Sequence, residues 1–113
     1  MDWKPVIEEN FKVGLVDLMI LKSISVKDMY GYEIMLMMSE KTNDKFQIRE
    51  GSLYGPLYRL QNKGLITSSK VLVGAKRFRI YYHITDLGRE YLACAIEVFE
   101  DIYTAANKIL KEI

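Results

Sequence analysis

Side chains that can hold phosphate or the edges of bases gather in one short stretch of this sequence, GSLYGPLYRLQNK at residues 51–63. Leucines recur there at steps of four and three residues, the period of a helix that packs one side against a core. The other side carries hydroxyls, amides and cations, which donate hydrogen bonds to phosphate oxygens and base edges. The candidate nucleic-acid contacts on this side are Ser52, Tyr54, Gly55, Tyr58, Arg59 and Lys63.

Small residues near the start of this helix favour close approach to another surface. Gly51 and Gly55 lack side-chain bulk, and free N–H groups at a helix N-terminus favour an anion. Pro56 is expected within the first turn or just past it, where it removes at most one hydrogen bond. The alternative is that Tyr54 and Tyr58 only cover the core with their rings.

The charge distribution points to the same segment. The net charge is only +1, but residues 45–79 hold eight basic side chains against Glu50 alone, which gives +7 and leaves −6 for the rest of the chain. A clustered basic surface is typical of proteins that bind polyanions. The alternative is a solvated, lysine-rich face.

A catalytic site is hard to assemble from this sequence. The one histidine, His83, and the one cysteine, Cys94, are expected on different elements, and no metal-binding or nucleotide-binding motif occurs. We expect His83 to be an exposed strand residue and Cys94 a small apolar filler. No enzyme activity, metal or cofactor is therefore predicted.

The elements that position these residues follow from the hydrophobic periods. We expect helices at residues 3–10, 12–24, 29–41 and 52–63, strands at 65–73 and 78–85, and a last helix from Thr85 or Asp86 to about Lys111. This order predicts an α+β, mostly α fold: a winged helix-turn-helix with a two-stranded wing. The wing adds Lys76, Arg77 and Arg79 to the candidate DNA contacts.

The last helix carries apolar residues in a heptad pattern, which is typical of a helix that pairs with another helix. Further apolar residues widen this stripe beyond what one small domain can cover, so a homodimer is expected. The candidate interface residues are Leu92, Ala95, Phe99, Ile102, Ala106 and Ile109. We therefore divide the chain into a DNA-binding domain at 1–84, including the N-terminal helix, and a dimerisation helix at 85–113.

Composition sets the broad class. A chain of 113 residues with 50% hydrophobic and 27% charged residues suits one globular domain. A single cysteine suits a reducing compartment. No basic-then-apolar leader is seen, and no uncharged run approaches the ~20 residues of a membrane span. A cytoplasmic protein without a membrane partner is expected.

Three segments together resemble the PadR-type transcriptional regulators. They are GYEI at residues 31–34, GSLYGPLYRLQNKGLI at 51–66 and RFRIYYHITDLG at 77–88. The resemblance runs from about Gly14 to the end and is closest to compact members with one C-terminal helix. Phe78 is a departure, since the family more often has a basic run before the two tyrosines.

The resemblance implies a dimeric winged-helix repressor, released in some members by a phenolic or multidrug-like ligand. It places DNA contacts on Ser52, Tyr54 and Tyr58, and a close approach of two helices at Gly31, with Tyr32 as a buried packing residue. Phe99 takes the place of an aromatic that stacks on flat ligands at the dimer centre, or it merely fills the gap. The candidate ligand-binding residues are Phe99, Trp3 and Tyr103.

Two functions remain from these observations. The first is a dimeric regulator that binds a palindromic operator in double-stranded DNA and responds to a small aromatic effector. The second is a winged-helix module that binds protein, which should show exposed leucine or isoleucine on the wing and the helix at 52–63. The basic middle segment and the polar helix favour DNA.

Overall fold

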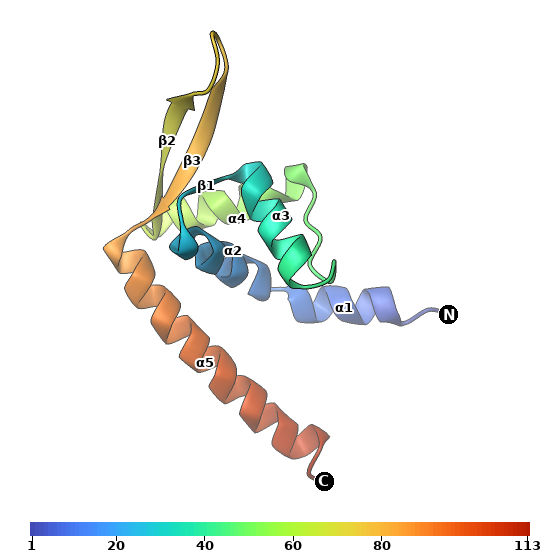
Figure 1. The fold of residues 1–113 in the computed structure, drawn as a ribbon. Coiled ribbons are helices and arrows are strands. Elements are labelled where there is room, and N and C mark those ends of the chain that lie inside the picture. Colours follow the sequence, from blue (N-terminus) through green and yellow to red (C-terminus); the bar gives the residue numbers. More distant parts are fainter.

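The computed structural model describes all 113 residues and contains five helices and three strands. The elements are α1 (Lys4–Lys12), α2 (Leu15–Val26), β1 (Met29–Tyr30), α3 (Gly31–Lys41), α4 (Glu50–Asn62), β2 (Ile66–Leu72), β3 (Phe78–Ile84) and α5 (Asp86–Leu110). Figure 1 shows α2, α3 and α4 gathered in one body, with the β2–β3 hairpin projecting from one side and α5 from the other. The predicted winged-helix order is confirmed.

Strand β1 is the element that the sequence did not predict. Residues 29–30 were expected to begin a helix, but they pair with β3 in the order β1-β3-β2, with Met29 opposite Tyr82. A strand of two residues is too short to show an alternating pattern. Its formation buries Met29, and Glu33 then accepts a hydrogen bond from the Tyr30 backbone N–H at 3.3 Å, at the start of α3.

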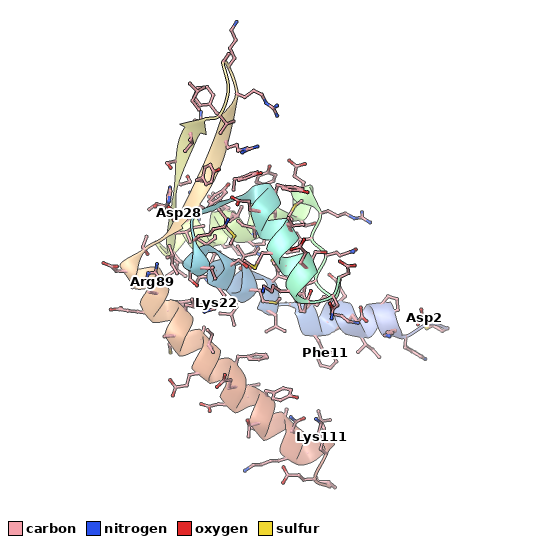
Figure 2. All side chains as sticks on the ribbon, in the orientation of Figure 1. Asp2, Phe11, Lys22, Asp28, Arg89 and Lys111 are labelled. Atoms are coloured by element: carbon pink, nitrogen blue, oxygen red, sulfur yellow. The ribbon has the colours of Figure 1, made fainter.

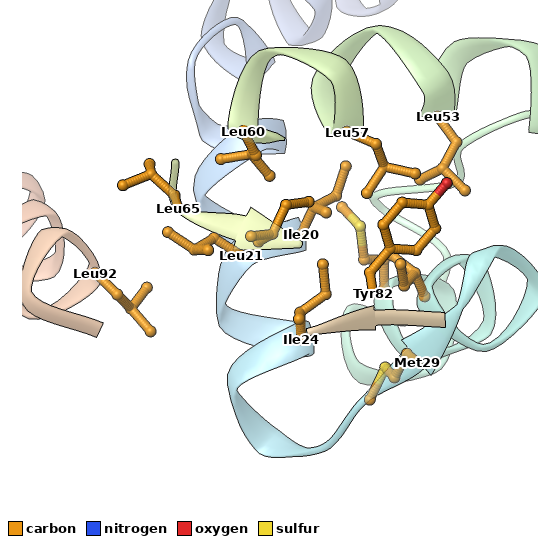
Figure 3. Packing of buried hydrophobic residues seen from close by; sticks show 13 residues of the cluster. Ile20, Leu21, Ile24, Met29, Leu53, Leu57, Leu60, Leu65, Tyr82 and Leu92 are labelled. Atoms are coloured by element: carbon orange, nitrogen blue, oxygen red, sulfur yellow. The ribbon is translucent and has the colours of Figure 1, made fainter. Parts of the chain in front are cut away.

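The core lies between α2, α3, α4 and the base of the wing. Figure 3 shows Leu53, Leu57 and Leu60 directed from α4 toward the buried residues of α2. All three leucines are at most 2% exposed. Burying a leucine side chain contributes about 1.5–3 kcal/mol, so this row alone fixes which face of α4 is inward.

Pro56 lies deeper in the helix than predicted. Helix α4 begins at Glu50 rather than near Ser52, so Pro56 sits inside it and is buried. A proline there cannot donate to the carbonyl four residues earlier, so one bond of the ladder is missing. The apolar ring packs on the same side as the leucines, which places the interruption away from the exposed polar face.

The joint between the wing and α5 is built from close backbone contacts. Gly64 ends α4 with a φ of +74°, a conformation that suits glycine. The Thr85 hydroxyl donates to the Gly64 carbonyl at 2.7 Å and accepts from the Gly88 N–H at 3.0 Å, so Thr85 is the N-cap of α5. A Cβ on Gly88 would lie 2.1 Å from the Leu65 carbonyl oxygen. The direction in which α5 leaves the body is therefore set by this contact.

Helix α1 is attached by polar contacts at its middle and end. The Lys45 Nζ lies 3.0 Å from Glu8 Oε1, and the Lys12 ammonium lies 5.2 Å from the centre of the Phe46 ring. The hydrogen bond from Lys45 lowers the pKa of the Glu8 carboxyl, with further contributions from neighbouring positive charges. No residue of α1 is buried within the chain.

Exposure along β3 follows the extent of the body, and Tyr32 and Cys94 differ from their predicted burial. Tyr82 is buried, but Phe78 and Ile80 on the same face of β3 are 63% and 44% exposed, because the hairpin extends past the body. Tyr32, expected inside, is 61% exposed at the start of α3. Cys94 is exposed rather than packed. None of the helices combines the length and apolar character that a membrane crossing requires.

The Gly88 contact yields a stability prediction. Gly88→Ala should lower the free energy of unfolding by about 1–3 kcal/mol, because the new methyl group meets the Leu65 carbonyl and Ile84. Gly51→Ala is the matched control, since that glycine is also in a first helical turn and a Cβ there meets nothing within 4 Å. Chemical denaturation should show Gly51→Ala unchanged or stabilised by up to about 1 kcal/mol. Equal effects of the two changes would contradict the packing at Gly88.

Candidate nucleic-acid interface

The exposed face of α4 carries the six polar and small residues that the sequence singled out. Tyr54 and Tyr58 are 54% and 65% exposed, while the neighbouring Leu53 and Leu57 are buried. Ser52, Gly55, Arg59 and Lys63 are also exposed. The helix therefore presents hydroxyl and cationic groups to solvent over its whole length, and its leucines hold it to the body.

Close packing at Gly31 places α3 against α4. A Cβ on Gly31 would lie 3.1 Å from the Leu53 Cδ2 atom, tighter than ordinary van der Waals contact. A larger residue would push α3 away from the start of α4. The expected role of this glycine in the approach of the two helices agrees with this geometry.

Arg59 is engaged within the chain. Its Nε and Nη2 atoms donate to the two carboxylate oxygens of Asp17 in α2 at 2.8 and 2.9 Å. This two-point hydrogen bond raises the pKa of the guanidinium further, and the attraction of the Asp17 charge adds to the effect. Because Asp17 compensates its charge, Arg59 orients α4 on α2 and has less charge to offer a phosphate than the other cations.

Lys63 lies at the far end of α4, close to the start of α5. Its ammonium group is 5.9 Å from the centre of the Tyr91 ring. Nearby, the Gln61 side-chain amide donates to the Ser68 hydroxyl at 2.8 Å and connects α4 with β2. The cationic end of α4 is thus joined to both the wing and the last helix.

The wing carries free cations at its tip. Lys76 and Arg77 are exposed, and neither takes part in any of the five ion pairs in the chain. Arg79 lies lower on β3, with its guanidinium 4.3 Å from the centre of the Tyr30 ring. The structure therefore leaves the two tip residues available to a polyanion and holds Arg79 against an aromatic ring.

Apolar side chains accompany these cations on the wing. Leu72 and Phe78 face each other across the hairpin and are 59% and 63% exposed. Ile80 continues the same face toward the body. The wing is thus a mixed basic and apolar surface rather than a purely basic one.

A hydrogen-bonded group that sequence reasoning missed joins β2 and β3 to the segment before β1. His83 is half-buried, with Nε2 2.7 Å from the Ser69 hydroxyl and Nδ1 2.9 Å from Asp28 Oδ2. The order of groups resembles a hydrolase triad, but none of the five main cavities is lined by these residues. The contacts fasten the segment before β1 to β3 and β2. Residues so far apart in sequence gave no signal of this contact.

The predicted ligand and interface residues lie on α1 and α5. Phe99 and Tyr103 stack on each other, with ring centres 6.3 Å apart, and both are exposed, as is Trp3. Of the interface residues, Leu92 is buried and Ala95 half-buried. The exposed interface residues are Phe99, Ile102, Ala106 and Ile109.

Fold and surface together define a winged-helix protein with an exposed polar helix and a protruding wing. Residues 20–94 match the model of the family described as "Transcriptional regulator PadR-like family". The chain belongs to this family of transcriptional regulators.

Several solved structures and one curated protein are similar to this chain. A transcriptional regulator from Clostridium thermocellum is 33% identical, with a TM-score of 0.83 over 90% of this chain and 99% of that one. A PadR-like regulator from Bacillus cereus is 31% identical, with a TM-score of 0.75 over 90% and 97%. An uncharacterized protein of Lysinibacillus sphaericus is 39% identical over 89 residues, which are 79% of this chain and 82% of the relative.

One further match was solved in complex with operator DNA. PadR from Bacillus subtilis is 23% identical, with a TM-score of 0.66 over 73% of this chain and 47% of that one. At this identity the match supports the fold alone.

The two faces of α4 can be tested by adjacent substitutions. Leu57→Ala should cost about 2–5 kcal/mol in the free energy of unfolding, because it empties a buried site. Tyr58→Ala should change stability by no more than about 0.5 kcal/mol, since the ring is largely in solvent. Thermal or urea unfolding of the two variants measures the difference. A large loss for Tyr58→Ala would show that its ring is part of the core.

Proposed function

We propose that the protein is a dimeric repressor that binds a palindromic operator through α4 and the wing. The observation that carries the proposal is the polar, exposed face of α4, which stands beside a wing whose tip cations lack partners. Helices of this kind enter the major groove of DNA, and cations beside them bind phosphate. The net charge of +7 over residues 45–79 supports a polyanion as the partner.

Unsatisfied apolar surface supports a dimer. After Ile96, every residue of α5 except the half-buried Asn107 is exposed, and the apolar ones include Phe99, Ile102 and Ile109. Figure 2 shows these later turns projecting from the body with no other element beside them. The radius of gyration is 16.2 Å, whereas a compact chain of this length has about 13 Å. A second copy would cover the long helix.

A dimer with two-fold symmetry sets the form of the operator. Two copies would present their α4 helices to successive major grooves on one side of the duplex. The half-sites should then form a palindrome with centres about 10 base pairs apart, or a multiple of this spacing. Such a regulator would act in the cytoplasm, where the DNA is.

Exposed aromatic rings support an effector site at the dimer centre. The stacked pair of Phe99 and Tyr103 offers a flat apolar surface, and Trp3, directly before α1, offers another. A planar aromatic compound held between two copies would release the operator if it bound one arrangement of the α4 helices better than the other.

One observation favours a second function, a module that binds protein. Exposed leucine and isoleucine on the wing were expected of such a module, and Leu72 and Ile80 are 59% and 44% exposed. The leucines of α4, by contrast, are buried. The salt dependence of binding separates the two functions, because contacts to phosphate release counterions and apolar contacts do not.

The salt dependence gives the sharpest test of DNA binding. Replacing both Lys76 and Arg77 by Ala should weaken binding to all DNA sequences and reduce the slope of log affinity against log salt by about 2. Lys111→Ala is the control: this exposed cation lies at the end of α5, away from α4 and the wing, so the slope should stay nearly unchanged. Fluorescence anisotropy at several salt concentrations measures both. Lost affinity at an unchanged slope in the double variant would mean that the wing acts by packing.

A charge on α5 tests the dimer. Ile102→Glu should dissociate the dimer or unfold it, because two carboxylates would be buried without partners. Operator affinity should then fall far more than one lost contact explains, since a monomer holds only half the site. Thr104→Glu places the same charge outside the heptad pattern and should leave sedimentation unchanged. A wild-type protein that sediments as a monomer and still binds the palindrome tightly would refute the dimer.

A further inference from the structure

A cavity of about 320 Å³ lies between the starts of α3 and α4 and strand β3. Most of its lining residues are hydrophobic, half of them are aromatic, and Glu50 is its one charged residue. The aromatic lining residues are Tyr30, Tyr32, Tyr54, Phe78 and Tyr82. The cavity is separate from the Phe99 pair, and neither the leucine row of α4 nor the wing tip explains its composition.

Glu50 makes this cavity unsuited to a phosphate group. It is the single acidic residue among eight basic ones in residues 45–79. Its Oε1 atom accepts a hydrogen bond from the Tyr54 hydroxyl at 3.3 Å, so the carboxylate is held against the aromatic group. A carboxylate in the first turn of α4 also suits the helix dipole. The dipole accounts for the charge but not for the aromatic residues around the cavity.

Aromatic rings beside a carboxylate attract organic cations. The faces of the rings carry partial negative charge, and quaternary ammonium groups bind in such aromatic cages. The structure shows such a contact beside the cavity, where the Arg79 guanidinium lies on the Tyr30 ring. Tyr30 pairs with Tyr81 and its ring contacts that of Tyr81, so Tyr30 and Arg79 share the face of β3 opposite Phe78 and Ile80. The Arg79 charge therefore stays out of the cavity, and the rings available to a ligand there are those of Tyr32, Tyr54, Phe78 and Tyr82.

Size and polarity also suit a small cation with an aromatic ring. A cavity of about 150 Å³ is enough to hold benzene, so about 320 Å³ accommodates a ring with an ammonium head. Figure 3 shows the Tyr82 ring with its hydroxyl directed toward α4, near Leu53. Burial raises the pKa of Tyr82, which keeps this hydroxyl protonated and uncharged. Glu50 is then the group that selects the charge of the ligand.

We propose that this cavity binds a small aromatic quaternary ammonium compound and that operator DNA excludes it. The second part rests on the proposed function, because Tyr54 belongs both to the cavity and to the face of α4 assigned to DNA. Occupancy would place a ligand between α4 and the wing, the two elements that must approach the duplex together. Each copy would thus have an effector site between its own α4 and wing. A ligand there would act without binding at the dimer centre.

The ligand part is tested on free protein, without DNA. Phenyltrimethylammonium is titrated by calorimetry and followed by NMR of the tyrosine rings, with N,N-dimethylaniline, uncharged at neutral pH, as the neutral analogue. The affinity for the cation should be at least about tenfold higher than the affinity for the analogue. Glu50→Gln should remove most of this preference, and Glu97→Gln, an exposed carboxylate on α5, should leave it unchanged.

A second variant guards against a fault in folding. Tyr32→Ala removes an exposed ring of the cavity. It should lower the affinity for the cation severalfold without changing the unfolding temperature. Equal binding of the cation and the neutral analogue would overturn the proposal. Loss of binding in Phe99→Ala with none in Glu50→Gln would also overturn it, since the ligand would then lie at the dimer centre.

The DNA part is tested by competition. The probe should weaken operator binding, and operator should weaken probe binding by the same factor. If the probe binds but leaves operator affinity unchanged, the shared surface is refuted. If the probe binds with the expected variant profile and no DNA binds at all, the proposed function is wrong and the cavity assignment holds.

Discussion

The row of leucines on α4 is the contact on which the remaining structure depends. Leu53, Leu57 and Leu60 bury one side of the helix against α2 and the base of the wing. Their burial turns Tyr54 and Tyr58 outward, since a helix can pack only one face. The same contact brings Gly31 against Leu53 and so fixes α3. Both the surface assigned to DNA and the aromatic cavity beside it are consequences of this single packing arrangement.

The chain as a single copy leaves much of its apolar surface in water. Only 16 of 113 residues are buried, and all of them lie in residues 20–92. Helix α1 contributes no buried residue, and α5 contributes two in its first turns. A long amphipathic helix beside a core this small is stabilised chiefly by burial of its apolar face against another element or another copy of the chain. The proposed dimer therefore concerns the stability of the fold as well as the geometry of the operator.

The cations of the basic segment differ in what lies beside them. Asp17 compensates Arg59, and the ring of Tyr30 holds Arg79, while Lys76 and Arg77 at the wing tip have no partner. Cations of the same type in one basic segment thus have different roles, decided by what lies beside each. Glu50 is the converse case: an acidic group inside a basic segment, which lies among aromatic rings where a cation is the favoured ligand.

The order of the main elements followed from the sequence alone, because hydrophobic period, Gly64 and Thr85 are local signals of helix and strand ends. The inward leucines and outward tyrosines of α4 were predictable for the same reason. Burial that depends on distant neighbours was not: Tyr32 is exposed, and Met29 joins a strand because β3 passes beside it. The pairing of Arg59 with Asp17, the His83 contacts and the aromatic cavity each join residues from separate elements. No local period encodes such contacts, and only the packing of the elements in three dimensions decides them.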